Sequence, residues 1–215
     1  MNFEVLVEDS SGAALLGHLI PAILGPEKSA HVWRIHRYKG LGSLNRNSIS
    51  PNDVAKRQLL NRLPALLAGF DSTPGYDFII VVVDSDTRDC RALLEELQFV
   101  VDERQLKIPV MFRLAVEEIE AWYFGDRKAI SAAYPQAKVK ELANYEQDKP
   151  CGTWELLLKA THPKSVRAMQ QGGWIAAGTI KHEWANTIGP CMNIETNNSP
   201  SFCKLRDGLR RMTSV

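Results

Sequence analysis

Cysteine is scarce in this chain of 215 residues, and the four that occur are isolated from one another. They are Cys90, Cys151, Cys191 and Cys203, and no two of them form a C-x-x-C pair. A structural zinc site or a disulfide scaffold is therefore not expected. The reducing cytoplasm is the expected location, because such environments keep isolated thiols reduced.

Long apolar runs and a secretory leader are also missing. A membrane-spanning helix needs about 20 consecutive apolar residues, and no run in the chain approaches that length. The opening segment, MNFEVLVEDSS, carries acidic residues and lacks a basic start. We therefore expect neither a signal peptide nor an association with a membrane.

The chain also lacks an excess of positive or negative charge. The formal net charge is +1, so any nucleic-acid partner must be bound by a local basic patch rather than by a global field. Neither the phosphate-binding order G-x-x-x-x-G-K-[ST] nor the nucleophile order G-x-S-x-G occurs. With 45% hydrophobic residues, the chain can build the core of one globular domain, and homo-oligomerisation stays open.

Four short segments have the composition of β-strands. They are Phe3–Val7, His31–Tyr38, Phe78–Val83 and Val110–Val116. Helical patterns separate them, at Ala13–Leu24, from Ser50-Pro51 to Gly69, and at Arg88–Arg104. This alternation predicts an α/β fold with a mostly parallel four-stranded sheet flanked by helices. Pro21 is expected to kink or shorten the first helix.

The C-terminal part of the chain has a different pattern. Beyond Glu117 the sequence favours helices, interrupted at Tyr134-Pro135, Lys149-Pro150 and Gly172-Gly173. We therefore predict an α/β core over residues 1–126 and a helical cap over residues 127–215, packed on that core.

Acidic residues stand where the predicted strands end. Glu8 follows the first strand, and Asp84 and Asp86 follow the third. Function in open α/β sheets gathers at the carboxyl ends of strands. In extended backbone, Asp84 and Asp86 would point to the same side, with Cα atoms about 6.5–7 Å apart. Hard oxygen ligands of this kind suit Mg²⁺ or Mn²⁺, so we predict a divalent-metal site.

Helix capping is the competing explanation for several of these acids. Asp86 precedes a predicted helix and could cap it. Glu117 and Glu118 fall in a predicted first helical turn, with Glu120 on the same face as Glu117. Glu8 is harder to explain in this way, because a serine, Ser10 or Ser11, is available as the cap of the first helix.

Basic residues cluster on and after the second predicted strand. They are Arg34, His36, Arg37 and Lys39. The segment Lys39–Asn47 is rich in Gly, Ser and Asn, so its backbone amides could approach a phosphate. A solvated basic strand face is the alternative.

Lys181 lies in a predicted helix that also contains Trp174 and Trp184. It could reach the acidic site and stabilise the charge of a phosphoryl group. The simpler interpretation is an exposed surface lysine.

The acids and their strands resemble the TOPRIM fold of topoisomerases, primases and OLD-family nucleases. The likeness rests on Val5-Leu6-Val7-Glu8 and on Val81-Val82-Val83-Asp84-Ser85-Asp86. The sequence departs from the usual pattern, because Gly12 comes late after the glutamate and Thr87-Arg88 follows the aspartate pair.

A closer resemblance is to the TOPRIM-like family DUF4276, along nearly the whole chain. The matching pieces are Glu8, Asp84-Ser85-Asp86-Thr87-Arg88-Asp89, Glu117-Glu118-Ile119-Glu120-Ala121-Trp122 with Asp126, Lys181 with Trp184-Ala185, and Asn198-Ser199-Pro200-Ser201-Phe202. Such proteins look like partners of ABC- or AAA-type ATPases in bacterial defence gene pairs. The resemblance implies a nuclease effector controlled by an ATPase.

The resemblance also implies roles for individual residues. Glu8 would be a metal ligand or general base, and Asp84 and Asp86 would bind one or two divalent ions. Glu120, rather than Glu117, would complete a second metal position, and Lys181 would act on the phosphate.

Three functions are consistent with these acids. The first is Mg²⁺- or Mn²⁺-dependent cleavage of DNA or RNA by an activated water molecule. The second is a non-catalytic TOPRIM-like subunit that binds an ATPase, which the long helical cap favours. The third is nucleotidyl transfer, for which the same carboxylates would serve.

Overall fold

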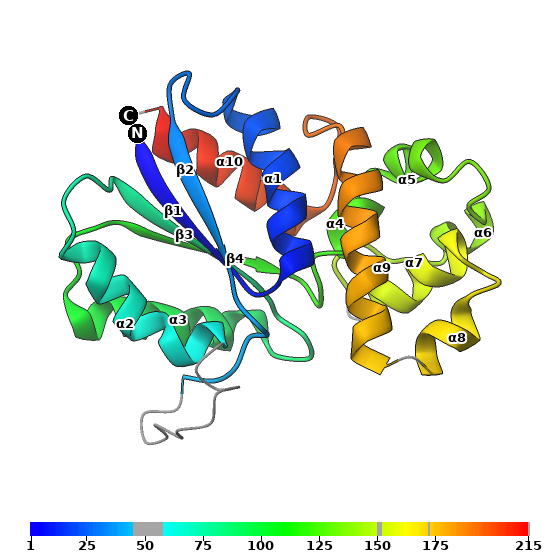
Figure 1. The fold of residues 1–215 in the computed structure, drawn as a ribbon, viewed down its shortest axis with the longest axis horizontal. Coiled ribbons are helices and arrows are strands. Elements are labelled where there is room, and N and C mark those ends of the chain that lie inside the picture. The colour runs from blue at the N-terminus through cyan, green and yellow to red at the C-terminus, as the bar shows by residue number, and fades with distance from the viewer. Residues whose placement is uncertain (45–57, 150–151, 172, 215) are drawn as a thin grey trace.

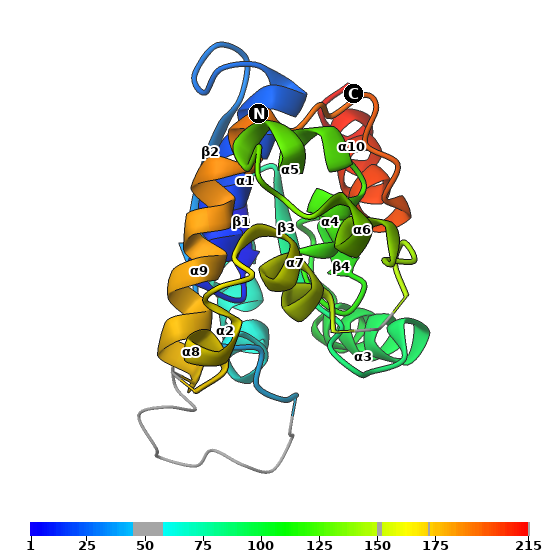
Figure 2. The same ribbon diagram turned by 90° about the vertical axis from the view of Figure 1, so that its right-hand side faces the viewer.

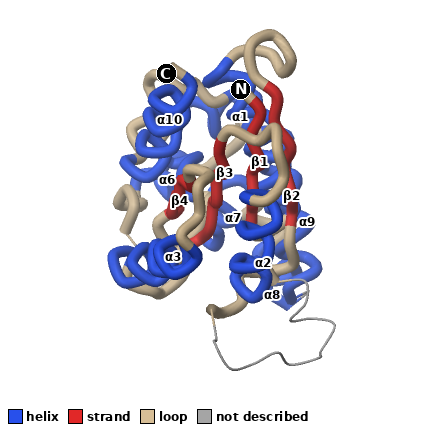
Figure 3. Tube along the Cα trace, turned by 90° about the vertical axis from the view of Figure 1, so that its left-hand side faces the viewer, coloured by secondary structure: helices blue, strands red, loops and turns tan. Residues whose placement is uncertain are grey.

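One parallel sheet organises the fold, with its strands in the order β2-β1-β3-β4 (Figures 1 and 3). The strands are β1 (Asn2–Val7), β2 (Val32–Arg37), β3 (Phe78–Asp84) and β4 (Val110–Ala115). All three pairings are parallel. The predicted four-stranded α/β sheet is therefore confirmed, and the apolar segment β3 lies inside the sheet, as its burial on both faces requires. A specifically TOPRIM-like arrangement remains a prediction.

The computed structural model describes residues 1–44, 58–149, 152–171 and 173–214. Ten helices in these ranges surround or extend the sheet. They are α1 (Ser10–Leu24), α2 (Leu59–Asp71), α3 (Cys90–Arg104), α4 (Ala121–Phe124), α5 (Arg127–Ala133), α6 (Val139–Ala143), α7 (Thr153–Thr161), α8 (Val166–Gln171), α9 (Gly173–Thr187) and α10 (Pro200–Thr213). A short 3₁₀ helix, η2 (Gly189–Cys191), precedes the last of them.

Alternate residues of each strand face two separate hydrophobic layers. Phe3, Val5 and Val7 of β1 pack in the layer beneath α1 and α10. Leu6, between them, packs in the layer beneath α2 and α3. This period of two is the expected consequence of the pleat, and it gives a helix–sheet–helix sandwich in which both faces of the sheet are covered.

The first helix begins differently from the prediction. Its N-cap is Asp9, whose carboxylate accepts a hydrogen bond of 2.7 Å from the backbone N–H of Gly12. Ser11 donates its hydroxyl to the same carboxylate instead of capping the helix. The helix also continues past Pro21 to Leu24, so Pro21 does not shorten it. The helix start predicted at Ser50-Pro51 lies outside the described residues.

Helices α4 to α9 form a cap beside the carboxyl ends of the strands (Figures 1 and 2). Helix α9 lies against α1, and its Trp184 is fully buried. Helix α10 falls within the range predicted for the cap, yet it packs on the sheet: Phe202, Leu205 and Leu209 join the layer beneath α1. None of the helices in the described ranges combines the length and apolarity needed to cross a membrane.

A buried polar node joins the two ends of the cap. Trp122 donates its indole N–H to Ser201 Oγ over 3.0 Å, and its carbonyl accepts from Asn197 Nδ2 over 2.8 Å. Ser199 caps α10, and Asp148 accepts hydrogen bonds from the Ser199 hydroxyl and the Ser201 amide. The E-A-W and S-P-S-F pieces of the sequence therefore meet in space as a structural joint.

Candidate functional site

Two acidic side chains lie side by side at the carboxyl edge of the sheet. Glu8 follows β1 and Asp84 ends β3, and these strands are direct neighbours, with Val7 paired to Val82. Burial and the charges of Asp86 and Asp9 raise the pKa of Glu8 to about 7. Burial and the charges of Glu8 and Glu120 raise the pKa of Asp84 well above its usual range. The predicted pair is thus brought together.

Asp86 reaches the same site from a turn. Its backbone is left-handed, with φ of 48°, and its N–H donates to the carbonyl of Glu117 over 2.9 Å. The prediction that Asp84 and Asp86 share one side of an extended strand is therefore wrong, because β3 ends at Asp84. Asp86 does not cap α3 either, since Asp89 is the N-cap of that helix. The charge of Asp86 nevertheless raises the pKa of Glu8.

The carboxylate of Glu117 lies at the start of α7. Its φ of 59° breaks the predicted helical turn, and α4 begins only at Ala121. Its carboxylate accepts hydrogen bonds from the backbone N–H groups of Gly152, at 2.8 Å, and Thr153, at 3.1 Å. Glu117 therefore caps α7, and the prediction that it shares a helical face with Glu120 is wrong.

Glu118 and Glu120 turn into the site instead. Glu120 is fully buried, and burial raises its pKa above the ordinary value, with Lys181 opposing the effect. Burial and the charge of Glu120 raise the pKa of Glu118 to about 8. The sequence prediction contained Glu120 but missed Glu118. The direction of the Glu118 side chain depends on the left-handed backbone of Glu117, which the sequence does not reveal.

Lys181 enters the acidic group from the cap. Its Nζ lies 3.3 Å from Glu118 Oε1 and 3.3 Å from Glu120 Oε2. Burial by itself would lower the pKa of Lys181, but the charges of Glu120, Glu118 and Asp84 raise it above the ordinary value. Lys181 is therefore a charged, paired residue of this site and not a surface lysine.

The basic residues on and after β2 differ in their surroundings. His36 pairs with the buried Glu4 on the sheet, so it is not available for a phosphate. The loop that follows lies at the acidic edge, because the N–H of Gly40 donates to the carbonyl of Glu8 over 3.1 Å. This contact places the exposed Lys39 next to the site, while Arg34 and Arg37 are exposed on the edge strand.

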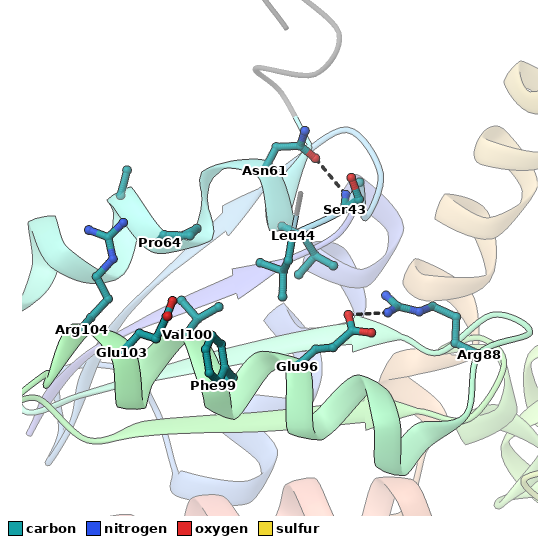
Figure 4. A pocket seen from close by; sticks show the side chains of 13 residues that line it. Ser43, Leu44, Asn61, Pro64, Arg88, Glu96, Phe99, Val100, Glu103 and Arg104 are labelled. Atoms are coloured by element: carbon teal, nitrogen blue, oxygen red, sulfur yellow. Dashed lines mark hydrogen bonds and ion pairs between the residues drawn. The ribbon is translucent and has the colours of Figure 1, made fainter. Parts of the chain in front are cut away.

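A groove of about 1060 Å³ runs between α2 and α3, away from the acidic cluster (Figure 4). Arg88, which lies at its end nearest Asp86, pairs with Glu96 over 2.6 Å. Glu103 and Arg104 lie side by side along α3. Because two acids and two bases line it, this groove does not present a positive surface for a polyanion.

The donors in the acidic cluster suit a hard divalent cation. They are carboxylates, which is the ligand type that Mg²⁺ and Mn²⁺ prefer. Among the described residues, Glu8 Oε2, Glu118 Oε2 and Glu120 Oε1 are buried without a hydrogen-bond partner. Such oxygens are costly to bury. No three acidic, histidine or cysteine side chains in the described ranges converge as a finished metal cage, so ligation requires rotamer adjustment.

The raised pKa values predict how stability depends on pH. Glu8 and Glu118, with pKa values of about 7 and about 8, bind protons more tightly in the folded chain than in the unfolded chain. Their stabilising effect is therefore present at pH 5 and is lost as the pH rises toward 8. In the presence of a chelator, we expect the melting temperature of Glu118→Gln to fall less between pH 6 and pH 8.5 than that of the wild type. Equal changes in both proteins would contradict this.

Comparison with known proteins gives one match. The profile of a family described as "Domain of unknown function (DUF4276)" matches residues 7–210. No curated protein and no solved structure matches the chain. The matched range includes every acid of the cluster as well as Lys181.

Proposed function

The chain belongs to the DUF4276 family, and from its site we propose that it is a cytoplasmic, divalent-metal-dependent nuclease with a TOPRIM-like core. The observation that carries this proposal is the convergence of Glu8, Asp84, Asp86, Glu118 and Glu120 at one sheet edge. Several of their buried oxygens have no hydrogen-bond partner within the described residues. The substrate is a phosphodiester of DNA or RNA.

Each acidic residue has a part in this proposal. Glu8, Asp84 and Asp86 would hold one Mg²⁺ or Mn²⁺, and Glu120 would complete a second metal position; the metal would lower the pKa of bound water and neutralise phosphate charge. Where Glu8 is not bound to the metal, it would instead accept a proton from the attacking water. Hydrolysis of one P–O bond would leave two nucleic-acid fragments, one ending in a phosphate group and the other in a hydroxyl group.

Two cations support the binding of the phosphate. The ammonium group of Lys181 lies at the inner wall of the cluster and can stabilise negative charge on a phosphoryl group. Lys39 lies at the outer edge, beside the loop that contacts Glu8. These positions support a nucleic-acid strand that crosses the carboxyl edge of the sheet, where its backbone would pass between the two lysines.

The ATPase partner and the role in anti-phage defence rest on the family resemblance described above. An ABC- or AAA-type ATPase would control the nuclease. The cap supports this part of the proposal because it adds a surface, from α5 to α8, that the acidic site does not use. Co-expression of the chain with a candidate ABC- or AAA-type ATPase, followed by co-purification, would test it.

Cleavage assays test the central proposal. The purified chain should cut labelled single-stranded or double-stranded DNA, RNA or tRNA in the presence of Mn²⁺ or Mg²⁺. It should lose this activity in chelator. Binding of Mn²⁺ without cleavage of any substrate would favour the non-catalytic subunit. Incorporation of labelled nucleotides in place of cleavage would favour nucleotidyl transfer.

A further inference from the structure

Lys181 occupies a position between two buried carboxylates that a metal ion would otherwise take. Its Nζ is equidistant, at 3.3 Å, from one oxygen of Glu118 and one oxygen of Glu120. The Lys181 and Glu118 side chains are each 17% exposed, and Glu120 is 0% exposed. Two carboxylates this deep repel each other unless a cation lies between them, and here the protein itself supplies that cation.

The pairing is incomplete in a way that points to a second occupant. Lys181 contacts Glu118 Oε1 and Glu120 Oε2, while Glu118 Oε2 and Glu120 Oε1 have no hydrogen-bond partner among the described residues. One ammonium group thus faces two carboxyl groups and leaves two of their buried oxygens with neither a hydrogen bond nor an ion pair among the described residues. A divalent ion would balance both charges and accept several oxygens at once.

The other acids of the cluster are not tied in this way. Glu8 Oε2 is buried without a hydrogen-bond partner in the described residues, and none of the ion pairs found there includes Glu8, Asp84 or Asp86. The cluster is therefore divided into an open part, Glu8 with Asp84 and Asp86, and a part that Lys181 fills.

We propose that Lys181 is a resident cation that reserves the Glu118–Glu120 pair, so that the open part takes one divalent ion and a second ion enters only when Lys181 withdraws. This inference rests on the proposed metal-dependent function. It assigns a regulatory role to the cap, because Lys181 is carried by α9, whereas the carboxylates lie at or just after the carboxyl ends of β1, β3 and β4.

The position of α9 determines whether Lys181 reaches the pair. Ile180, Trp184 and Ile188 are buried and hold the helix, and Trp184 donates to Thr161 Oγ1 of α7 over 3.2 Å. A partner that moves α9 relative to α1 would withdraw the ammonium group and free both carboxylates. Movement of the cap would thus regulate the site by changing the number of divalent ions that it binds.

Mn²⁺ binding to the full chain tests the proposal directly. Isothermal titration and electron paramagnetic resonance would compare the wild type with Lys181→Met, which keeps the length of the side chain and removes its charge. We expect one ion in the wild type and a second ion in Lys181→Met. Lys159→Met, at an exposed lysine of α7, is the matched control and should bind as the wild type does.

A second variant keeps the test valid if Lys181→Met does not fold. Glu118→Gln should leave the single Mn²⁺ of the wild type unchanged, because that pair is reserved, and it should abolish the second ion when added to Lys181→Met. Unchanged Mn²⁺ stoichiometry and affinity in a folded Lys181→Met, or loss of the wild-type ion in Glu118→Gln, would overturn the inference and leave the nuclease proposal standing. Absence of Mn²⁺ binding in every folded variant would overturn both.

Discussion

Asp84→Asn is expected to lower the rate of phosphodiester cleavage by about 10³-fold or more, with the protein still folded. Asp84 ends β3 beside Glu8, and burial together with the negative charges of Glu8 and Glu120 raises its pKa. An amide at this position keeps the shape of the side chain but removes the charge that a divalent cation requires. The measurement is single-turnover cleavage in Mn²⁺, together with a thermal melt in chelator.

The melt separates a functional role from a structural one. Removing one charge from a group of repelling carboxylates should leave the melting temperature of Asp84→Asn equal to or above that of the wild type. Glu8→Gln should behave in the same way. Glu95→Gln, at an exposed acid of α3, is the control and should keep full activity. Full cleavage by both Asp84→Asn and Glu8→Gln would refute the assignment of this site.

Trp122→Ala is expected to destabilise the folded chain by about 3–5 kcal/mol. The Trp122 side chain is fully buried, packs edge-on against Phe202 and donates its N–H to Ser201 Oγ. Truncation leaves a cavity at the joint between the core and the cap and also leaves the Ser201 hydroxyl without this donor. Since domains are stable by only about 5–15 kcal/mol, urea denaturation should show a large shift of the midpoint.

A matched variant separates packing from hydrogen bonding at the same position. Trp122→Phe keeps much of the aromatic volume and loses the indole N–H, so it should cost less than Trp122→Ala. Ser201→Ala removes the acceptor and should cost about 1 kcal/mol. An unfolding free energy of Trp122→Ala within about 1 kcal/mol of the wild-type value would show that this joint does not stabilise the fold.

The sheet could be predicted from the sequence because its strands carry strong patterns. The unbroken apolar run of β3 indicates a strand buried on both faces, and both hydrophobic layers contact it. Short strands separated by helical segments indicate parallel pairing. The helix start at Asp9 was less predictable, since Asp9, Ser10 and Ser11 are all good capping residues and only the backbone conformation selects one.

The candidate site was predictable where it depends on strand ends and unpredictable where it depends on turns. Glu8 and Asp84 converge because parallel neighbours end at the same edge. Glu117 and Glu118 are not in the predicted first helical turn, because the left-handed backbone of Glu117 rotates the chain after β4. Lys181 is more than sixty residues from the other members of the cluster in sequence, and no periodicity relates it to them.

The return of α10 to the sheet makes the cap an insertion in the chain rather than an appendage. The chain enters and leaves the cap at the joint of Trp122, Asn197 and Ser201. The cap is therefore attached to the core at two adjacent points. Shortening the chain from its C-terminus would therefore uncover one face of the sheet before it removed any of the cap. An isolated core is obtained only by excising the intervening helices and rejoining the ends near the joint, and a boundary drawn once, at residue 126, would split the core itself.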